Sequence, residues 1–278
     1  MPAEAERDTL AGVEPRPGVA KPDPILEVRD LAKSFDALVA VDVHHLSVQR
    51  RAITALIGPN GAGKTTLFNL VTGFDHPDRG EWEFDHIRLG RLPAHRIAQH
   101  GLVRTFQLTK ALAKMSVLDN MMLGASGQRG ERLGSCLFKQ IWNPQERDIE
   151  ARARALLDRF GLAGVAGDYA GTLSGGQRKL LEMARALMAE PRMIMFDEPT
   201  AGVNPALKES ILDHIRELRD AGMTVLFVEH DMDVVMGISD WVVCMDLGEA
   251  IAEGRPEEVG RNEAVIDAYL GARAEAPG

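Results

Sequence analysis

The sequence predicts an α/β protein with a mostly parallel β-sheet core, an antiparallel β subdomain and an inserted α-helical subdomain. Residues 58–65 fit the pattern G-x-x-x-x-G-K-S/T between an apolar run and a helix-compatible run, as a phosphate-binding loop requires. Strand-like and helix-like segments alternate from 193 to 230, which indicates parallel strand pairing with right-handed crossovers. Between these regions, residues 108–170 change to a helical pattern and form the predicted insertion.

Composition restricts the class of protein. The chain has 278 residues, enough for one large α/β domain or two small ones. Its formal net charge of −9 argues against nucleic acid as the main partner, because phosphate backbones are bound by positive surface. No apolar run approaches the roughly 18 residues that span a bilayer, and the N-terminus lacks the apolar segment of a signal peptide. We therefore expect a soluble, cytoplasmic protein that can still dock on a membrane protein.

The phosphate loop is the first local signal in the chain. Its glycines let the backbone curl so that successive N–H groups point into one concavity, and the following helix adds unpaired N–H groups and a positive dipole end. We expect Lys64 to contact the β- and γ-phosphates of a nucleotide and the Thr65 hydroxyl to hold Mg²⁺.

The domain boundaries follow changes in the sequence pattern. The first 24 residues carry five prolines and no apolar period, so we expect a disordered tail there. The predicted order is the N-terminal tail (1–24), the first part of the nucleotide-binding core with the β subdomain (25–107), the helical subdomain (108–170), the second part of the core (171–255) and a C-terminal extension (256–278).

The helical subdomain contains two informative stretches and a loop-like one at 124–145. Apolar residues at 149, 153, 156, 157 and 160 fall on one face of a helix. A methionine-rich apolar cluster at 115–123 suits either a deformable contact with another protein or ordinary core packing.

Polar residues follow two buried strands in the second part of the core. The strand at 193–196 is followed by Asp197 and Glu198, and the next strand along the chain is followed by Glu229 and His230. In open α/β sheets, ligands bind at this carboxyl edge. Phosphoryl chemistry needs a carboxylate for the metal and a group that polarises water, which suit Asp197 and Glu198 respectively.

A second anion-binding turn precedes the first of these strands. Leu173-Ser174-Gly175-Gly176-Gln177 leads into a helix that Pro191 ends, and a Ser-Gly-Gly turn at a helix N-terminus presents free N–H groups. With this pentapeptide after the phosphate loop, the sequence resembles the ATP-binding cassette ATPases, the motor subunits of ABC transporters, over residues 25–250. The matched phosphate loop comprises Gly58, Pro59, Asn60, Gly61, Ala62, Gly63, Lys64, Thr65 and Thr66.

The resemblance implies roles for individual residues. Phe35 would stack on the adenine of ATP, whereas residue chemistry alone leaves open a strand residue packed inward. Gln107 would reach both Mg²⁺ and the attacking water, and Asp197 would supply the carboxylate that holds Mg²⁺. Glu198 would act as the catalytic base, and His230 would touch the γ-phosphate.

The resemblance also implies a site shared between two chains. Ser174, Gly175, Gly176 and Gln177 would contact the γ-phosphate held by a second ATPase subunit, so that two subunits close head-to-tail around two ATP molecules. One position departs from the family pattern, because Asn204 stands where an aspartate is usual. This change removes a charge from the loop that meets the partner subunit.

Short matches narrow the resemblance to the branched-chain amino-acid importer ATPases; they lie at 202–205, 229–232, 237–240 and 268–271. The implied partners are a second ATPase subunit, identical or paralogous, two transmembrane permease subunits and, indirectly, a solute-binding protein. The chain would work at the cytoplasmic face of the membrane. The alternatives are the ATPase of a urea or amide importer, that of a lipopolysaccharide exporter, or a soluble ATP-dependent switch.

Overall fold

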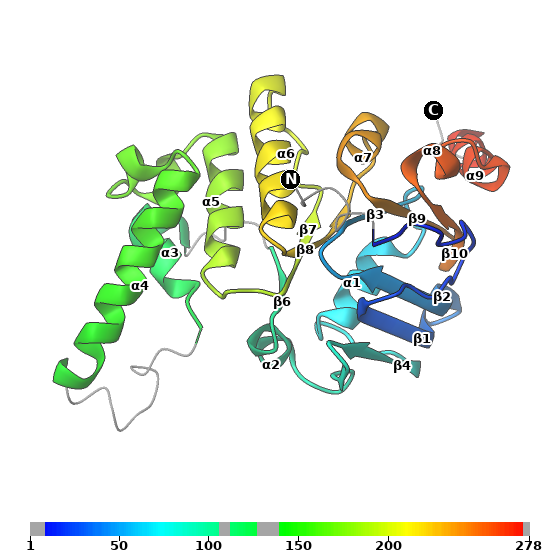
Figure 1. The fold of residues 1–278 in the computed structure, drawn as a ribbon, viewed down its shortest axis with the longest axis horizontal. Helices are drawn as coiled ribbons and strands as arrows, with labels where there is room; N and C mark the ends of the chain where they lie inside the picture. The colour runs from blue at the N-terminus through cyan, green and yellow to red at the C-terminus, as the bar shows by residue number, and fades with distance from the viewer. Residues whose placement is uncertain (1–8, 106–111, 127–138, 275–278) are drawn as a thin grey trace.

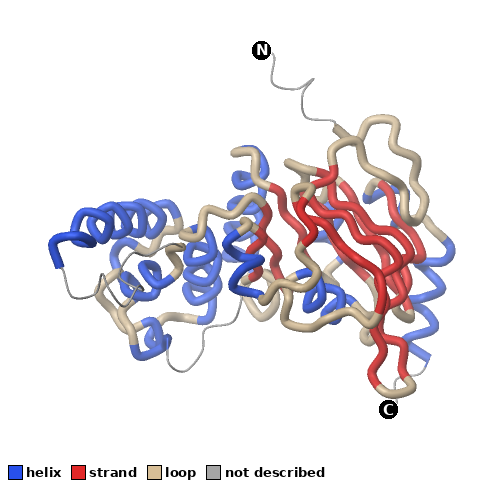
Figure 2. The backbone as a smooth tube through the Cα atoms, turned by 90° about the horizontal axis from the view of Figure 1, so that it is seen from below, coloured by secondary structure: helices blue, strands red, loops and turns tan. Residues whose placement is uncertain are grey.

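Two β-sheets and a helical subdomain make up the computed structural model, which describes residues 9–105, 112–126 and 139–274. A six-stranded sheet has the order β10-β9-β3-β8-β7-β6, and a four-stranded antiparallel sheet has the order β2-β1-β4-β5. In Figures 1 and 2 the strands gather in one part of the molecule, and α3, α4 and α5 lie together at the opposite end. The strands are β1 (Pro24–Phe35), β2 (Leu38–Gln49), β3 (Ile53–Ile57), β4 (Arg79–Phe84), β5 (Ile87–Arg88), β6 (Leu102–Arg104), β7 (Met193–Asp197), β8 (Thr224–Val228), β9 (Trp241–Asp246) and β10 (Glu249–Gly254).

The helices separate the strands and cover the sheets. They are α1 (Lys64–Val71), α2 (Ala94–Gln99), α3 (Val117–Leu123), α4 (Lys139–Arg159), α5 (Gly175–Leu187), α6 (Pro205–Asp220), α7 (Met232–Ile238), α8 (Pro256–Val259) and α9 (Glu263–Ala274). Among the described residues, no helix is both long enough and apolar enough to cross a membrane.

The parallel core forms because its strands are apolar on both faces. All residues of β3 and β8 are buried, as expected for strands covered on each side. Strand β3 pairs in parallel with β8 and β9, and β7 pairs in parallel with β6 and β8. Strand β10, which the sequence did not predict, pairs antiparallel with β9. The predicted mostly parallel α/β core with an antiparallel β subdomain is therefore confirmed.

Helix α6 begins where its capping residue indicates. Asn204 caps α6 by accepting the N–H of Leu207 at 3.0 Å, and Pro205 occupies the first turn. In the helical subdomain, Met121 and the apolar face of α4 are buried in one core cluster. This burial identifies core packing as the role of Met121.

The N-terminal segment was predicted wrongly over residues 9–23. Lys21 forms a salt bridge of 2.8 Å with Glu253 of β10, and both side chains are almost fully buried. The second carboxylate oxygen of Glu253 accepts the N–H of Val19 at 2.7 Å, and Leu10 is buried in the core. The segment lacks an apolar period because isolated side chains and one ion pair, rather than a helix or strand face, attach it to the core.

The helical subdomain differs from the prediction at the start of α4. Residues 124–145 were expected to be loop-like, whereas α4 begins at Lys139. The first two turns of α4 have a mostly polar sequence without the apolar period that marks the helix further on.

Candidate functional site

The phosphate loop joins β3 to α1 and is pressed against neighbouring backbone. Gly58 has φ 142°, and a Cβ atom there would lie 2.0 Å from the carbonyl oxygen of Met245 in β9. Gly63 has φ 98°, and its Cβ would lie 2.3 Å from the carbonyl oxygen of Ala40 in β2. Only glycine fits both positions, because a side chain would meet a left-handed backbone and another chain segment at once.

The Lys64 side chain folds back and contacts the start of the phosphate loop. Its ammonium donates hydrogen bonds to the carbonyl oxygens of Gly58 at 2.7 Å and Pro59 at 2.8 Å. Burial lowers the pKa of Lys64, while the nearby acidic groups, Asp197 and Glu198 among them, oppose that shift. A partly buried ammonium held by neutral carbonyls suits a phosphate, which would supply full negative charge.

Asp197 ends β7 at the carboxyl edge of the parallel sheet. One oxygen of its carboxylate accepts a hydrogen bond of 2.6 Å from the guanidinium of Arg104, which ends β6. The same guanidinium donates to the side-chain oxygen of Asn69 in α1, also at 2.6 Å. Arg104 therefore connects the strand that carries the carboxylate to the helix that follows the phosphate loop. The sequence prediction missed this residue because its three-residue strand is too short to show a period.

Glu198 has a strained backbone and an accessible carboxylate. Its φ of 48° lies in the left-handed region that residues other than glycine rarely occupy. Two backbone hydrogen bonds fix Glu198 in this conformation. Its N–H donates to the carbonyl oxygen of Val228 at 3.0 Å, and its carbonyl oxygen accepts from the Lys179 ammonium at 3.1 Å. The Glu198 carboxylate lies 3.8 Å from Nδ1 of His230, and both side chains are exposed. Two strand ends thus bring together the predicted base and the predicted histidine.

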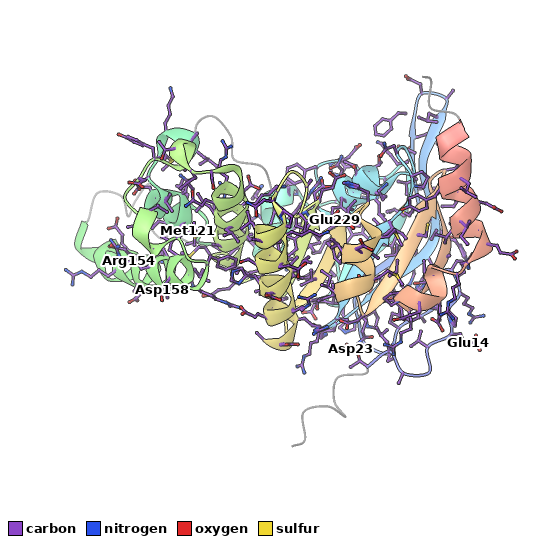
Figure 3. All side chains as sticks on the ribbon, turned by 90° about the horizontal axis from the view of Figure 1, so that it is seen from above. Glu14, Asp23, Met121, Arg154, Asp158 and Glu229 are labelled. Carbon is purple, nitrogen blue, oxygen red and sulfur yellow. The ribbon has the colours of Figure 1, made fainter. Side chains whose placement is uncertain are left out.

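The Glu229 side chain accepts hydrogen bonds from both strand-end loops, the one after β7 and the one after β8. This side chain is buried, and one oxygen accepts the Thr200 N–H at 3.1 Å and the Thr200 hydroxyl at 2.6 Å. The other oxygen accepts the backbone N–H of His230 at 3.2 Å. Figure 3 places Glu229 near the middle of the molecule, between the helical subdomain that contains Met121 and the end that contains Glu14. The sequence placed Glu229 at the strand end and assigned it no role, although an acidic residue directly after a buried strand is a usable signal.

A cleft opens beside these strand ends. Its volume is about 680 Å³, and Arg104, Lys179, Asp197 and Glu198 contribute to its lining. Helix α5, which supplies Lys179, packs against α3 and α4 of the helical subdomain, so the cleft lies between the parallel core and these helices. Gln107, the residue predicted to reach Mg²⁺ and the attacking water, lies outside the described residues.

The Ser174–Gln177 turn lies apart from the phosphate loop. The Ser174 hydroxyl accepts the N–H of Gln177 at 3.2 Å, and the Gln177 side chain accepts the N–H of Ser174 at 3.0 Å, which forms a capping box at the start of α5. Ser174 and Gly175 are exposed. Helix α5 lies with the helical subdomain, whereas α1 lies among the strands (Figure 1).

Phe35 ends β1 with its ring accessible. The side chain is 48% exposed, and the Lys33 ammonium lies 5.3 Å from the ring centroid. The inward-packed alternative for Phe35 is therefore wrong. An exposed ring leaves a face on which a purine base can stack.

The parallel core, phosphate loop and strand-end carboxylates define a nucleotide-binding α/β protein. A family model described as ABC transporter matches residues 41–201, and one described as branched-chain amino acid ATP-binding cassette transporter matches residues 251–275. The chain belongs to the ABC transporter family, and it is an ATP-binding cassette ATPase.

Relatives and solved structures agree with this assignment. The chain is 40% identical to the high-affinity branched-chain amino acid transport ATP-binding protein BraF of Pseudomonas aeruginosa over 250 residues, 89% of this chain and 98% of the relative. The same figures hold for LivG of Escherichia coli, a protein described in the same terms. The ADP conformation of an ATP-binding cassette of an ABC transporter superposes with a TM-score of 0.79 at 38% identity, covering 89% of this chain and 99% of that one. A nucleotide-free cassette superposes with a TM-score of 0.78 at 37% identity, covering 88% and 98%.

Proposed function

We propose that this chain hydrolyses MgATP with Glu198 as the base that polarises the attacking water. The backbone of Glu198 supports this role most directly. It is strained and held by hydrogen bonds at its N–H and its carbonyl oxygen, and the carboxylate stays accessible beside His230. Strain of this kind is retained where the surrounding structure fixes a functional side chain. His230 would contact the γ-phosphate, and Lys64 would leave the Gly58 and Pro59 carbonyls to contact the β- and γ-phosphates.

Mg²⁺ fits the residues at the mouth of the loop. Asp197 supplies a carboxylate oxygen and Thr65 an exposed hydroxyl, and hard divalent cations prefer such oxygen ligands. The carboxylate of Asp197 already attracts the cationic guanidinium of Arg104. Bound Mg²⁺ would neutralise phosphate charge, while Arg104 would keep the Asp197 side chain oriented toward the loop.

A second ATPase subunit would complete the site. The exposed Ser174–Gln177 turn offers helix N-terminal N–H groups, with the hydroxyl of Ser174 beside them, outside the phosphate loop of its own chain. We infer that this turn contacts the γ-phosphate bound by a partner subunit. Lys179 and Glu198 are hydrogen-bonded within one chain, so movement of α5 on dimer closure would act directly on the backbone of the proposed base.

The transported solute is inferred from relatives. The proteins BraF and LivG carry names that assign them to branched-chain amino acid transport, and the C-terminal family match carries the same description. We propose that the chain energises uptake of branched-chain or related amino acids at the cytoplasmic face, docked on two permease subunits that receive solute from a binding protein.

Reconstitution with the permease subunits of a branched-chain amino acid importer and its binding protein tests this function. ATP hydrolysis should rise when leucine, isoleucine or valine is added on the binding-protein side. The control is Glu198→Gln, which should bind ATP and give no turnover. Hydrolysis by the parent chain without stimulation by any branched-chain permease pair would contradict the solute; near-normal hydrolysis by Glu198→Gln would contradict its role as base.

A further inference from the structure

The C-terminal helix α9 reaches the start of the phosphate loop. We propose that Tyr269 of α9 is a positioning residue for nucleotide binding, which acts by fixing Gly58 at the first turn of the loop. This inference rests on the proposed nucleotide site and adds to it a residue from outside the nucleotide-binding core.

The contact is a single hydrogen bond between distant parts of the sequence. The backbone N–H of Gly58 donates to the hydroxyl oxygen of Tyr269 at 2.9 Å, across 211 positions. Gly58 is buried, and a buried backbone N–H without a partner costs free energy comparable to a lost hydrogen bond. Tyr269 therefore satisfies a donor that the end of β3 would otherwise leave unpaired.

Gly58 is fixed from three directions. The carbonyl oxygen of Met245 occupies the space where a Cβ would stand, and the Tyr269 hydroxyl accepts the N–H. The Gly58 carbonyl oxygen accepts a hydrogen bond from Lys64, the residue expected to contact the phosphates. Until Lys64 leaves this carbonyl for the phosphates, a series of contacts runs from α9 through Gly58 to the Lys64 ammonium.

Helix α9 is itself attached to the core. Val265 is buried, and Tyr269 packs partly buried against the same core cluster. Burial raises the pKa of Tyr269, so its hydroxyl stays neutral at physiological pH and remains a stable hydrogen-bond acceptor. The ring fixes the hydroxyl in place through packing, and the hydroxyl then fixes the loop.

The contact joins two differently matched parts of the chain. Gly58 lies in the segment matched by the general ABC transporter model, and Tyr269 lies in the segment matched by the branched-chain model. Nucleotide affinity in this chain therefore depends on a helix that contributes nothing to the phosphate cradle itself.

Tyr269→Phe isolates the hydroxyl because it keeps the ring. The affinity for MgADP, measured by isothermal titration calorimetry, should fall about fivefold, as loss of one buried hydrogen bond predicts. MgADP avoids turnover and needs no partner subunit. The matched control is Tyr169→Phe at the only other tyrosine, which is 64% exposed in the helical subdomain and should bind MgADP as the parent does.

Amide hydrogen exchange separates positioning from a general loss of structure. In Tyr269→Phe, exchange should rise in the peptide that contains Gly58 and stay unchanged in peptides from β10 and α8. Unchanged MgADP affinity and unchanged exchange at Gly58 would overturn the inference, and so would a Tyr269→Phe chain that fails to fold. A parent chain that does not bind MgADP would instead overturn the proposed nucleotide site.

Discussion

The phosphate loop and the Ser174–Gln177 turn are both glycine-containing predicted anion sites at helix N-termini, yet the chain holds them differently. The loop is enclosed by strands and by α9, with backbone or hydroxyl groups against Gly58 and Gly63. The turn closes on itself through its capping box, and nothing lies within 4 Å of a Cβ built at Gly175. The loop is therefore held by its own chain at Gly58 and Gly63, whereas the turn contacts its own chain at Gly176 and is open at Gly175.

This difference indicates what each site can bind alone. A cradle fixed before the ligand arrives loses little freedom on binding, so the phosphate loop should hold a nucleotide in a single subunit. The turn has the N–H groups and the hydroxyl of an anion site, and it is exposed at Ser174 and Gly175, although Gly176 packs against Leu207 of α6. Its exposed side would be covered by a partner subunit, as the resemblance to ATP-binding cassettes implies.

Alanine substitution of one glycine in each site gives the largest contrast. Gly58→Ala places a Cβ 2.0 Å from the Met245 carbonyl oxygen. The loop must therefore shift, and MgADP affinity should fall about a hundredfold, equivalent to about 3 kcal/mol. Gly175→Ala enters open space, so MgADP affinity of the single subunit should stay within about twofold of the parent. Isothermal titration calorimetry on both variants checks this contrast. Equal losses of MgADP affinity in Gly58→Ala and Gly175→Ala would contradict it.

Removing the Ser174 hydroxyl gives the smaller effect. Ser174→Ala loses the N-cap of α5 and should lower the free energy of unfolding by about 1 kcal/mol, measured by chemical denaturation. MgADP binding by the single subunit should not change, because the capping box is confined to the turn. A loss of MgADP affinity in this variant would show that the turn supports the loop of its own chain.

The fold was predictable where local sequence carries the information. Strand β8 (Thr224–Val228) lies directly before Glu229 and His230, as the apolar run there indicates, and Asn204 caps α6 as its side chain and the following proline indicate. The apolar face of α4 was read from its period, but the polar start of that helix was not. Local period and capping patterns therefore predicted the core elements, whereas the start of α4, which lacks an apolar period, was not predicted.

Sequence motifs predicted the residues of the candidate site, but they did not predict the long-range contacts that hold those residues in place. Lys64, Asp197, Glu198 and His230 follow strands or glycines in recognisable patterns, although their roles stay predictions. Tyr269 acts on a loop 211 positions away, and Lys21 pairs with Glu253 across 232 positions. Such contacts depend on how the sheets assemble, which no local window contains.

In the proposed dimer, one chain's phosphate loop works with another chain's Ser174–Gln177 turn. Lys64→Ala damages the first half-site and Ser174→Arg the second, so each variant alone should lose ATP hydrolysis. In co-assembled dimers of the two variants, one composite site keeps an intact loop and an intact turn. The mixture should recover about a quarter of the parent rate, because half of randomly paired dimers carry one intact site of two. A mixture no more active than either variant alone would contradict the shared site.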